Sequence, residues 1–243
     1  MTSTAADRDQ PAKPPRRPAI RWGRRLEHRR PGARFGIVLG LLLVTFAFMA
    51  AGLHGDWVPL VTVILQGVTL LAALAASEAL VRIVRISAFV IAAGLIAGIV
   101  TLFHSSDTAR GLTSLISLML VALAPGAIGW ALIRRRRVDL DTVLGAICVY
   151  VLLGMLWAFA YATIGYFSST GFFAQHQPAT TANTLYFSFI TLTTVGYGDF
   201  TPASGLPRAA ASLEALSGQL YLVTVVALVV SQLAGRRSDE PHE

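Results

Sequence analysis

Long apolar runs separated by short polar stretches occupy most of the chain after residue 34. A helix needs about 18 or more predominantly apolar residues to cross a bilayer. Six runs meet this length, at residues 35–53, 57–81, 86–103, 112–133, 142–166 and 209–234. The polar stretches between the first four runs are short and contain HGDW, VRIVR and HSSDTARG. The pattern therefore predicts an all-α membrane protein with six transmembrane helices.

The composition agrees with this pattern. Hydrophobic residues make up 54% of the 243 positions and charged residues only 14%, whereas soluble domains contain about 25% charged residues. The only cysteine, Cys148, falls inside an apolar run. A single cysteine excludes an intrachain disulfide, a cysteine zinc site and a redox pair within the chain.

The basic residues are distributed unevenly. Ten of the twenty Lys and Arg residues lie in residues 1–34, a segment rich in Pro and Arg that we expect to be a disordered tail. If this tail is cytoplasmic, only Arg110 and Arg208 lie outside the cell, as the positive-inside rule requires. We therefore expect a plasma-membrane protein with both termini in the cytoplasm. Orientation and contact of the tail with anionic lipids then explain the net charge of +7, without nucleic-acid binding.

A polar stretch separates the last two spans. Residues 167–180 contain many turn-forming residues and predict an extracellular loop. Residues 181–193 are apolar but too short to cross the membrane. A helix of this length is tolerated inside a bilayer only if it is buried in protein or lines water, so we expect a re-entrant pore helix. Thr180, Thr181 or Asn183 would cap its first turn.

Glycine alternates with other residues in the segment that follows, Thr194-Val195-Gly196-Tyr197-Gly198. Because glycine readily adopts positive φ, successive carbonyl groups can point to the same side of this segment. Four such segments around an axis would form rings of carbonyl oxygens, with a lowest ring of Thr194 hydroxyls, that replace the water shell of a cation. Each chain has one copy of the segment, so the rings require a homotetramer.

The stretch TLTTVGYGDFTP, residues 191–202, resembles the selectivity filter of tetrameric potassium channels, and it matches the pattern TxxTxGYGD followed by Pro202. The resemblance covers residues 142–234, as outer helix, pore helix, filter and inner helix. It implies a potassium-selective channel rather than an enzyme, with passive K⁺ flow and no cofactor apart from the permeant ion.

The resemblance also implies roles for single residues. The carbonyl groups that would coordinate K⁺ are those of Thr194, Val195, Gly196 and Tyr197. The Tyr197 ring would brace the filter against the pore helix, and Asp199 would raise the cation concentration at the outer mouth.

The sixth span contains a candidate pore-lining face. Helical periodicity places four residues on this face: Gln219, Leu222, Val226 and Val230. If the face lines the pore, Gln219 lies below the filter and the valines form an apolar gate, but a lipid-facing or interhelical stripe would have the same pattern. Gly218 lies twenty residues after Gly198, where potassium channels often have a hinge glycine. Close helix packing also uses glycine, so both roles remain open.

Glu214 is an acidic residue within the same span, and such residues are costly enough to indicate function. Three interpretations remain open. The carboxyl group supports the filter by bonding Ser188, Thr191 or Thr193; it faces the cavity and attracts cations; or it pairs with Arg208.

The six-span layout resembles that of voltage-gated channels, but the fourth span lacks the required charges. A voltage sensor carries about three to four basic residues per subunit through the membrane, and residues 112–133 contain none. Arg134–Arg137 are contiguous and predict a membrane anchor. Arg82 and Arg85 are assigned to the inner end of the second span, beside Glu78. We therefore expect weak or absent voltage dependence.

The sequence thus divides into a tail at 1–34, a four-helix domain at 35–137, a pore domain at 138–235 and a stub at 236–243. The elements expected in the pore domain are an outer helix at 142–166, a pore helix at 181–193, the filter at 194–198 and an inner helix at 209–234. The four-helix domain would be a packing collar, a lipid contact or a sensor of unknown input. The stub is too short for a ligand-binding domain, so the sequence indicates no gating stimulus.

Two other functions share these features. A non-selective cation channel would have the same architecture, although Tyr197 favours the four-ring filter of potassium channels. A non-conducting accessory subunit would have the same topology. A transporter is disfavoured because the chain has no second copy of the site. An intramembrane enzyme is disfavoured because, apart from Glu78 and Glu214, the spans contain no candidates for a nucleophile-base pair or a set of metal ligands.

Overall fold

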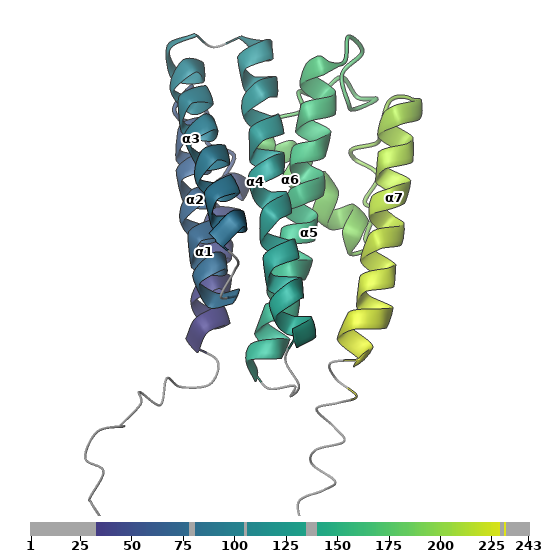
Figure 1. Ribbon diagram of the computed structural model, residues 1–243. Coiled ribbons are helices and arrows are strands. Elements are labelled where there is room, and N and C mark those ends of the chain that lie inside the picture. Colours follow the sequence, from purple (N-terminus) through teal and green to yellow (C-terminus); the bar gives the residue numbers. More distant parts are fainter. Residues whose placement is uncertain (1–32, 78–80, 105, 135–139, 229–230, 232–243) are drawn as a thin grey trace, which may run out of the picture. The chain divides into compact units, whose positions relative to one another are not determined.

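A computed structural model describes residues 33–77, 81–104, 106–134, 140–228 and 231. These residues belong to one compact unit and form seven α-helices and one π-helical segment (Figure 1). The elements are α1 (Ala33–Ala50), α2 (Val58–Ser77), α3 (Val81–Phe103), α4 (Asp107–Arg134), α5 (Leu140–Phe167), α6 (Thr181–Leu192), α7 (Gly205–Tyr221) and the π-helical segment η1 (Leu222–Val226). The prediction of an all-helical protein is confirmed for these residues.

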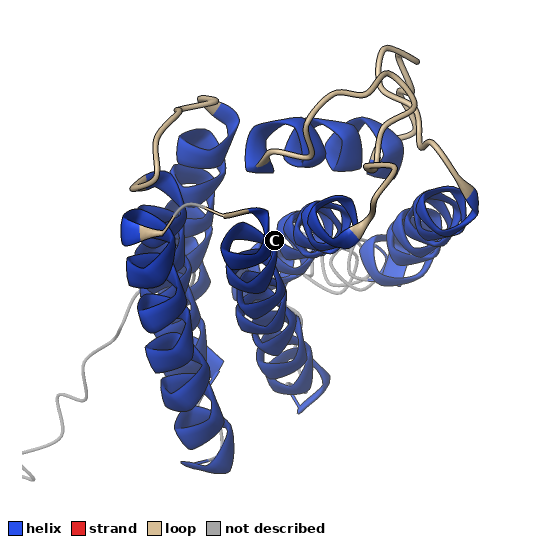
Figure 2. Cartoon of the chain, turned by 90° about the horizontal axis from the view of Figure 1, so that it is seen from above, coloured by secondary structure: helices blue, strands red, loops and turns tan. Residues whose placement is uncertain are grey.

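Helix α5 lies between two groups of helices. On one side it contacts α1 and α4, which pack with α2 and α3, and on the other it contacts α6 and α7 (Figure 1). The core of the first group is apolar and includes buried residues of α1, α2, α4 and α5, among them Leu42, Leu70, Leu120 and Leu152. Figure 2 looks down the long helices and shows the short helix α6 lying across them.

Several helices are long and apolar enough to cross a membrane. Among the described residues these are Val58–Ser77, Arg82–Phe103, Asp107–Trp130 and Leu140–Phe167, and Arg34–Ala50 is a shorter apolar helix. The last predicted span, 209–234, extends into residues that the structure does not describe. The full number of six spans therefore stays a prediction.

Three helices begin four or five residues earlier than the apolar runs indicated. Helix α3 begins at Val81, so the VRIVR stretch is helical, and the assignment of Arg82 and Arg85 to the end of the second span was wrong. Helix α4 begins at Asp107 and α7 at Gly205. Arginine is a good helix former, so a charged residue ends an apolar run without ending the helix. Glu78 lies outside the described residues.

The predicted tail at 1–34 overlaps helix α1 by two residues, because Ala33 and Arg34 are helical. Residues 1–32 lie outside the described part of the chain, as do residues 135–139, which include three of the four arginines assigned to the anchor.

Candidate ion-conduction site

Helix α6 is a short helix that begins at a side-chain cap. The Thr180 hydroxyl accepts a hydrogen bond from the Asn183 backbone N–H at 3.3 Å, and the Asn183 side chain donates to the Pro178 carbonyl at 2.9 Å. Of the three possible caps, Thr180 therefore fills the role, because its extended backbone brings its oxygen to the free amides of the first turn. The helix ends at Leu192, one residue before the predicted end.

Two glycines let α6 approach α5 and α7 closely. A Cβ added at Gly154 of α5 would lie 2.7 Å from the Phe189 ring, and one added at Gly218 of α7 would lie 2.6 Å from Cδ1 of Leu192. Real Cβ contacts are essentially never shorter than 3.0 Å. Of the two roles considered for Gly218, this contact provides direct support for close packing.

A buried polar network joins α5, α6 and α7. The Glu214 side chain is 0% exposed, and its carboxyl group bonds the Ser188 hydroxyl of α6 and the Tyr161 hydroxyl of α5. Ser188 also lies 2.7 Å from the Gly154 carbonyl oxygen, to which it donates. Of the partners considered for Glu214, Ser188 is therefore the one in contact, and Tyr161 is a partner that the sequence did not suggest.

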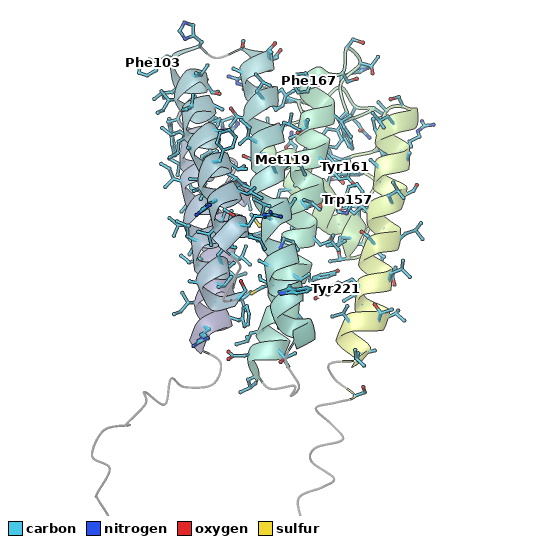
Figure 3. All side chains as sticks on the ribbon, viewed as in Figure 1. Phe103, Met119, Trp157, Tyr161, Phe167 and Tyr221 are labelled. Atoms are coloured by element: carbon cyan, nitrogen blue, oxygen red, sulfur yellow. The ribbon has the colours of Figure 1, made fainter. Side chains whose placement is uncertain are left out.

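Three aromatic side chains of α5 and α7 bond these two helices along their length (Figure 3). Besides the Tyr161 contact, the Trp157 indole donates to the Ser217 hydroxyl at 3.2 Å, and the Tyr221 hydroxyl donates to the Ala146 carbonyl at 2.6 Å. These bonds hold the two helices that flank α6 in a fixed register.

Backbone conformation alternates through the segment after α6. Thr194, Gly196 and Gly198 have φ values of 61°, 55° and 81°, whereas Val195 and Tyr197 are not among the positive-φ residues. The segment begins against the end of α6, because the Ile190 carbonyl accepts bonds from the amides of Val195 at 2.9 Å and Gly196 at 3.1 Å. Positive φ is unfavourable for a β-branched residue, so Thr194 holds a conformation that its own side chain disfavours.

The two threonines before this segment, Thr191 and Thr193, join it to the end of α6. The Thr193 hydroxyl donates to the Phe189 carbonyl at 2.6 Å, and the Thr191 carbonyl accepts from the Thr194 amide at 3.0 Å. Glu214 instead contacts Ser188, one turn earlier.

Asp199 follows the segment and contacts α6. Its carboxylate accepts a hydrogen bond from the Tyr186 hydroxyl at 2.8 Å and another from the Phe200 amide at 3.0 Å. The bond to Asp199 raises the pKa of the Tyr186 phenol above its ordinary value, because the phenol donates to a carboxylate. Tyr186 therefore holds the residue predicted at the outer mouth.

The loop before α6 is packed against the chain after the segment. Ala174 donates to the Thr201 carbonyl at 2.8 Å and Ala203 donates to the Phe172 carbonyl at 2.9 Å. Phe172 and Phe173 are completely buried, in a cluster with Tyr161 and Phe187. Sequence reasoning treated this stretch only as a polar loop, although the adjacent phenylalanines were a signal of burial.

The proposed gate face is only partly described. Gln219 and Leu222 are exposed in the single chain. The structure does not describe the side chain of Val226 or any part of Val230. The α-helix changes to a π-helix at Leu222. A π-helical turn has a longer hydrogen-bonded repeat, so the regular periodicity that grouped these four residues does not continue through η1.

Comparison with known protein families bears on this part of the chain. Residues 149–234 match a family model described as Ion channel. The match covers most of α5, all of α6, the alternating segment, α7 and η1. The chain therefore contains an ion channel domain of the two-helix pore type, and the apolar helices agree with a membrane protein. Comparisons with curated proteins and with solved structures gave no match.

Proposed function

We propose that the chain is one subunit of a potassium-selective channel that passes K⁺ passively across the plasma membrane. The observation that carries this proposal is the alternating backbone of residues 194–198, placed after a short helix within an ion channel domain. Alternation between the left-handed and ordinary regions turns successive carbonyl groups to the same side. Thr194, Val195, Gly196 and Tyr197 then present their carbonyl oxygens to one axis, where they replace the water around K⁺.

The proposed channel is a homotetramer, because one chain supplies one wall of the filter. Exposed apolar side chains support this assembly. Tyr197 is 72% exposed and Val195 is 51% exposed in the single chain. Helix α7 and η1 expose a further group of large apolar residues: Leu213, Leu216, Leu220 and Val223. Neighbouring copies would cover these surfaces, and the Tyr197 ring would brace the filter against a pore helix.

In this proposal Glu214 supports the filter through α6. Glu214 bonds Ser188, which lies about one helical turn before Thr191 and Thr193. These two threonines connect the helix to the filter. Asp199, held by Tyr186, raises the cation concentration at the outer mouth. Gln219 and Leu222, which are exposed in the single chain, would line the inner cavity, and Val226 and Val230 would lie toward the gate, while Gly218 packs against Leu192 of α6.

The four-helix part is proposed to have no strong voltage-sensing role. Arg110 is the only basic residue of α4 before Arg134, and its side chain is paired with Asp56. Both termini are proposed to lie in the cytoplasm, where the basic tail meets anionic lipids. K⁺ is the permeant ion, and the proposed function involves no enzyme activity, cofactor or nucleic acid.

The test is cation flux from liposomes that contain the purified protein, with K⁺, Rb⁺ and Na⁺ compared under the same gradient. The proposal requires K⁺ and Rb⁺ flux to exceed Na⁺ flux strongly. Equal Na⁺ and K⁺ flux would identify a non-selective cation channel. Absence of flux, with the protein tetrameric and inserted, would favour the non-conducting accessory subunit.

A further inference from the structure

A cavity of about 560 Å³ lies at the end of the helices where α6 begins. Its walls come from both parts of the protein: the loop after α1, the helices α2 and α4, the outer part of α5, and the residues from Gln177 to Asn183. This volume lies within the range of about 300–1,000 Å³ that is typical of ligand pockets. The cavity therefore has the size of a binding site and touches both the four-helix part and the start of the proposed pore helix.

The cavity extends inward from the helix ends. On α4 its lining runs from Arg110 to Ser117, and on α5 it runs between Tyr166 and Phe159. Seven residues of α-helix span about 10 Å, so both walls have the same depth. An occupant would therefore enter between helices at the depth of the bilayer, rather than rest on a surface.

The mouth of the cavity carries one charge of each sign. Arg110 and Asp56 form an ion pair at 3.0 Å, and their side chains are 40% and 43% exposed. The contact between them uses one guanidinium nitrogen and one carboxylate oxygen, which leaves further donors on Arg110 and an acceptor on Asp56. This arrangement is complementary to a group that itself carries both a negative and a positive charge.

The inner part of the cavity has a different character. Met49 and Phe159 line it with carbon and sulfur atoms. The inner lining also has four hydroxyl side chains, those of Thr62, Thr113, Ser114 and Ser117. Those of Thr62 and Thr113 already donate to carbonyls of their own helices. The cavity thus combines a zwitterionic mouth with an interior of apolar and hydroxyl side chains, which suits the ester region and upper acyl chain of an amphipathic occupant.

We propose that this cavity binds a zwitterionic phospholipid, with the phosphate on Arg110, the ammonium on Asp56 and the upper part of an acyl chain against Met49 and Phe159. The proposal commits to the bilayer as the source, because lipid is present at high concentration around helices that cross a membrane. The bound lipid would connect α2 and α4 to the first turn of α6. This binding site stands whether or not the pore selects K⁺.

Native mass spectrometry of the purified full-length protein tests this proposal, after incubation with equal amounts of palmitoyl-oleoyl phosphatidylethanolamine and palmitoyl-oleoyl phosphatidylglycerol. The wild-type protein is expected to retain the ethanolamine lipid in preference to the glycerol lipid, since only the former has an ammonium group for Asp56. Asp56→Asn should remove this preference. Arg110→Gln should weaken retention of both lipids by about tenfold, the effect of losing one charge-assisted hydrogen bond.

A third variant separates the cavity from the ion pair. Ala182 lines the cavity, and Ala182→Trp should fill it and abolish retention while Arg110 and Asp56 remain in place. Variants are compared only if their circular dichroism and melting temperature match those of the wild type. Equal retention of the two lipids by the wild type would overturn the proposal, as would unchanged retention in both Arg110→Gln and Ala182→Trp. Equally tight binding of soluble glycerophosphoethanolamine would also overturn it, because the acyl chain would then contribute nothing.

Discussion

Ser188 of α6 and Glu214 of α7 are bonded to each other inside the protein, with both side chains completely buried. The Ser188 hydroxyl has one proton but lies within bonding distance of two oxygens, the Gly154 carbonyl and the Glu214 carboxyl. A carbonyl only accepts. All bonds are satisfied at once if Ser188 donates to Gly154 and a protonated Glu214 donates to Ser188, while Tyr161 donates to the other carboxyl oxygen. The geometry therefore favours a neutral Glu214.

Replacement of Glu214 by glutamine tests this assignment. Glu214→Gln keeps one donor for Ser188 and one acceptor for Tyr161, so we expect a melting temperature and K⁺/Na⁺ flux ratio close to those of the wild type. Glu214→Leu leaves both hydroxyls without their partner and should lower the free energy of unfolding by about 1–3 kcal/mol. Thermal unfolding in detergent and liposome flux measure these effects. A Glu214→Gln protein as unstable as Glu214→Leu would show that the network needs the charged carboxylate.

Gly218 provides a test between packing and hinge motion. A methyl group at this position would meet the Leu192 side chain at 2.6 Å and its carbonyl oxygen at 3.0 Å. We expect Gly218→Ala to lower the free energy of unfolding by about 1–3 kcal/mol, the usual cost of overpacking. Gly126→Ala is the matched control, since no atom lies within 4 Å of its added Cβ. If Gly218→Ala changes channel opening while its melting temperature stays that of the wild type, the hinge role is supported and the packing role is not.

Gln66 is a buried polar residue in the first group of helices. Neither its amide nitrogen nor its amide oxygen has a hydrogen-bond partner among the described residues. Its neighbours in a void of about 10 Å³ include Leu42, Leu120 and Met155. Because an unsatisfied buried polar group costs about 1–3 kcal/mol, we expect Gln66→Met to raise the melting temperature. A lower melting temperature for Gln66→Met would mean that the amide is bonded in the folded protein.

The contact between Tyr186 and Asp199 predicts a local effect at the mouth of the pore. Tyr186→Phe removes the donor that holds the Asp199 carboxylate at 2.8 Å, so we expect lower K⁺ flux and a lower K⁺/Na⁺ ratio with little change in melting temperature. Tyr221→Phe removes a hydroxyl bond of similar kind between α7 and α5, and this bond involves no residue of α6 or of the filter segment. That variant should lose stability and keep its selectivity. If instead Tyr186→Phe keeps its K⁺/Na⁺ ratio and Tyr221→Phe loses it, Asp199 has no role in ion selection.

Local features of the sequence predicted a large part of this structure. Apolar runs identified the long helices, because a membrane helix must satisfy its own backbone and bury its surface in lipid or protein. The cap at Thr180 and the alternation at Gly196 and Gly198 also depend on neighbouring residues only. Features of this kind are readable from a short window of sequence.

Contacts between distant residues were not readable in the same way. Tyr161 reaches Glu214 across 53 positions, and the burial of Phe172 depends on its pairing with the chain near Ala203. Both follow from how α5 and α7 enclose α6, which a single helix pattern does not specify. The start of α3 at Val81 was missed for another reason. Arg82 and Arg85 end the apolar run, but arginine is a good helix former, so the helix continues through them.

Gly196 gives the most direct test of the proposed filter. Its φ of 55° lies in the left-handed region, where a residue with a Cβ costs about 1–2 kcal/mol. A Gly196→Ala tetramer carries this cost in every subunit and would rotate carbonyl groups away from the axis. We therefore expect K⁺ flux to fall by about tenfold or more. Gly205→Ala is the matched control, because Gly205 has no positive φ and no atom within 4 Å of an added Cβ. Equal K⁺ flux in Gly196→Ala and Gly205→Ala liposomes, at equal protein content, would show that residues 194–198 do not line the ion path.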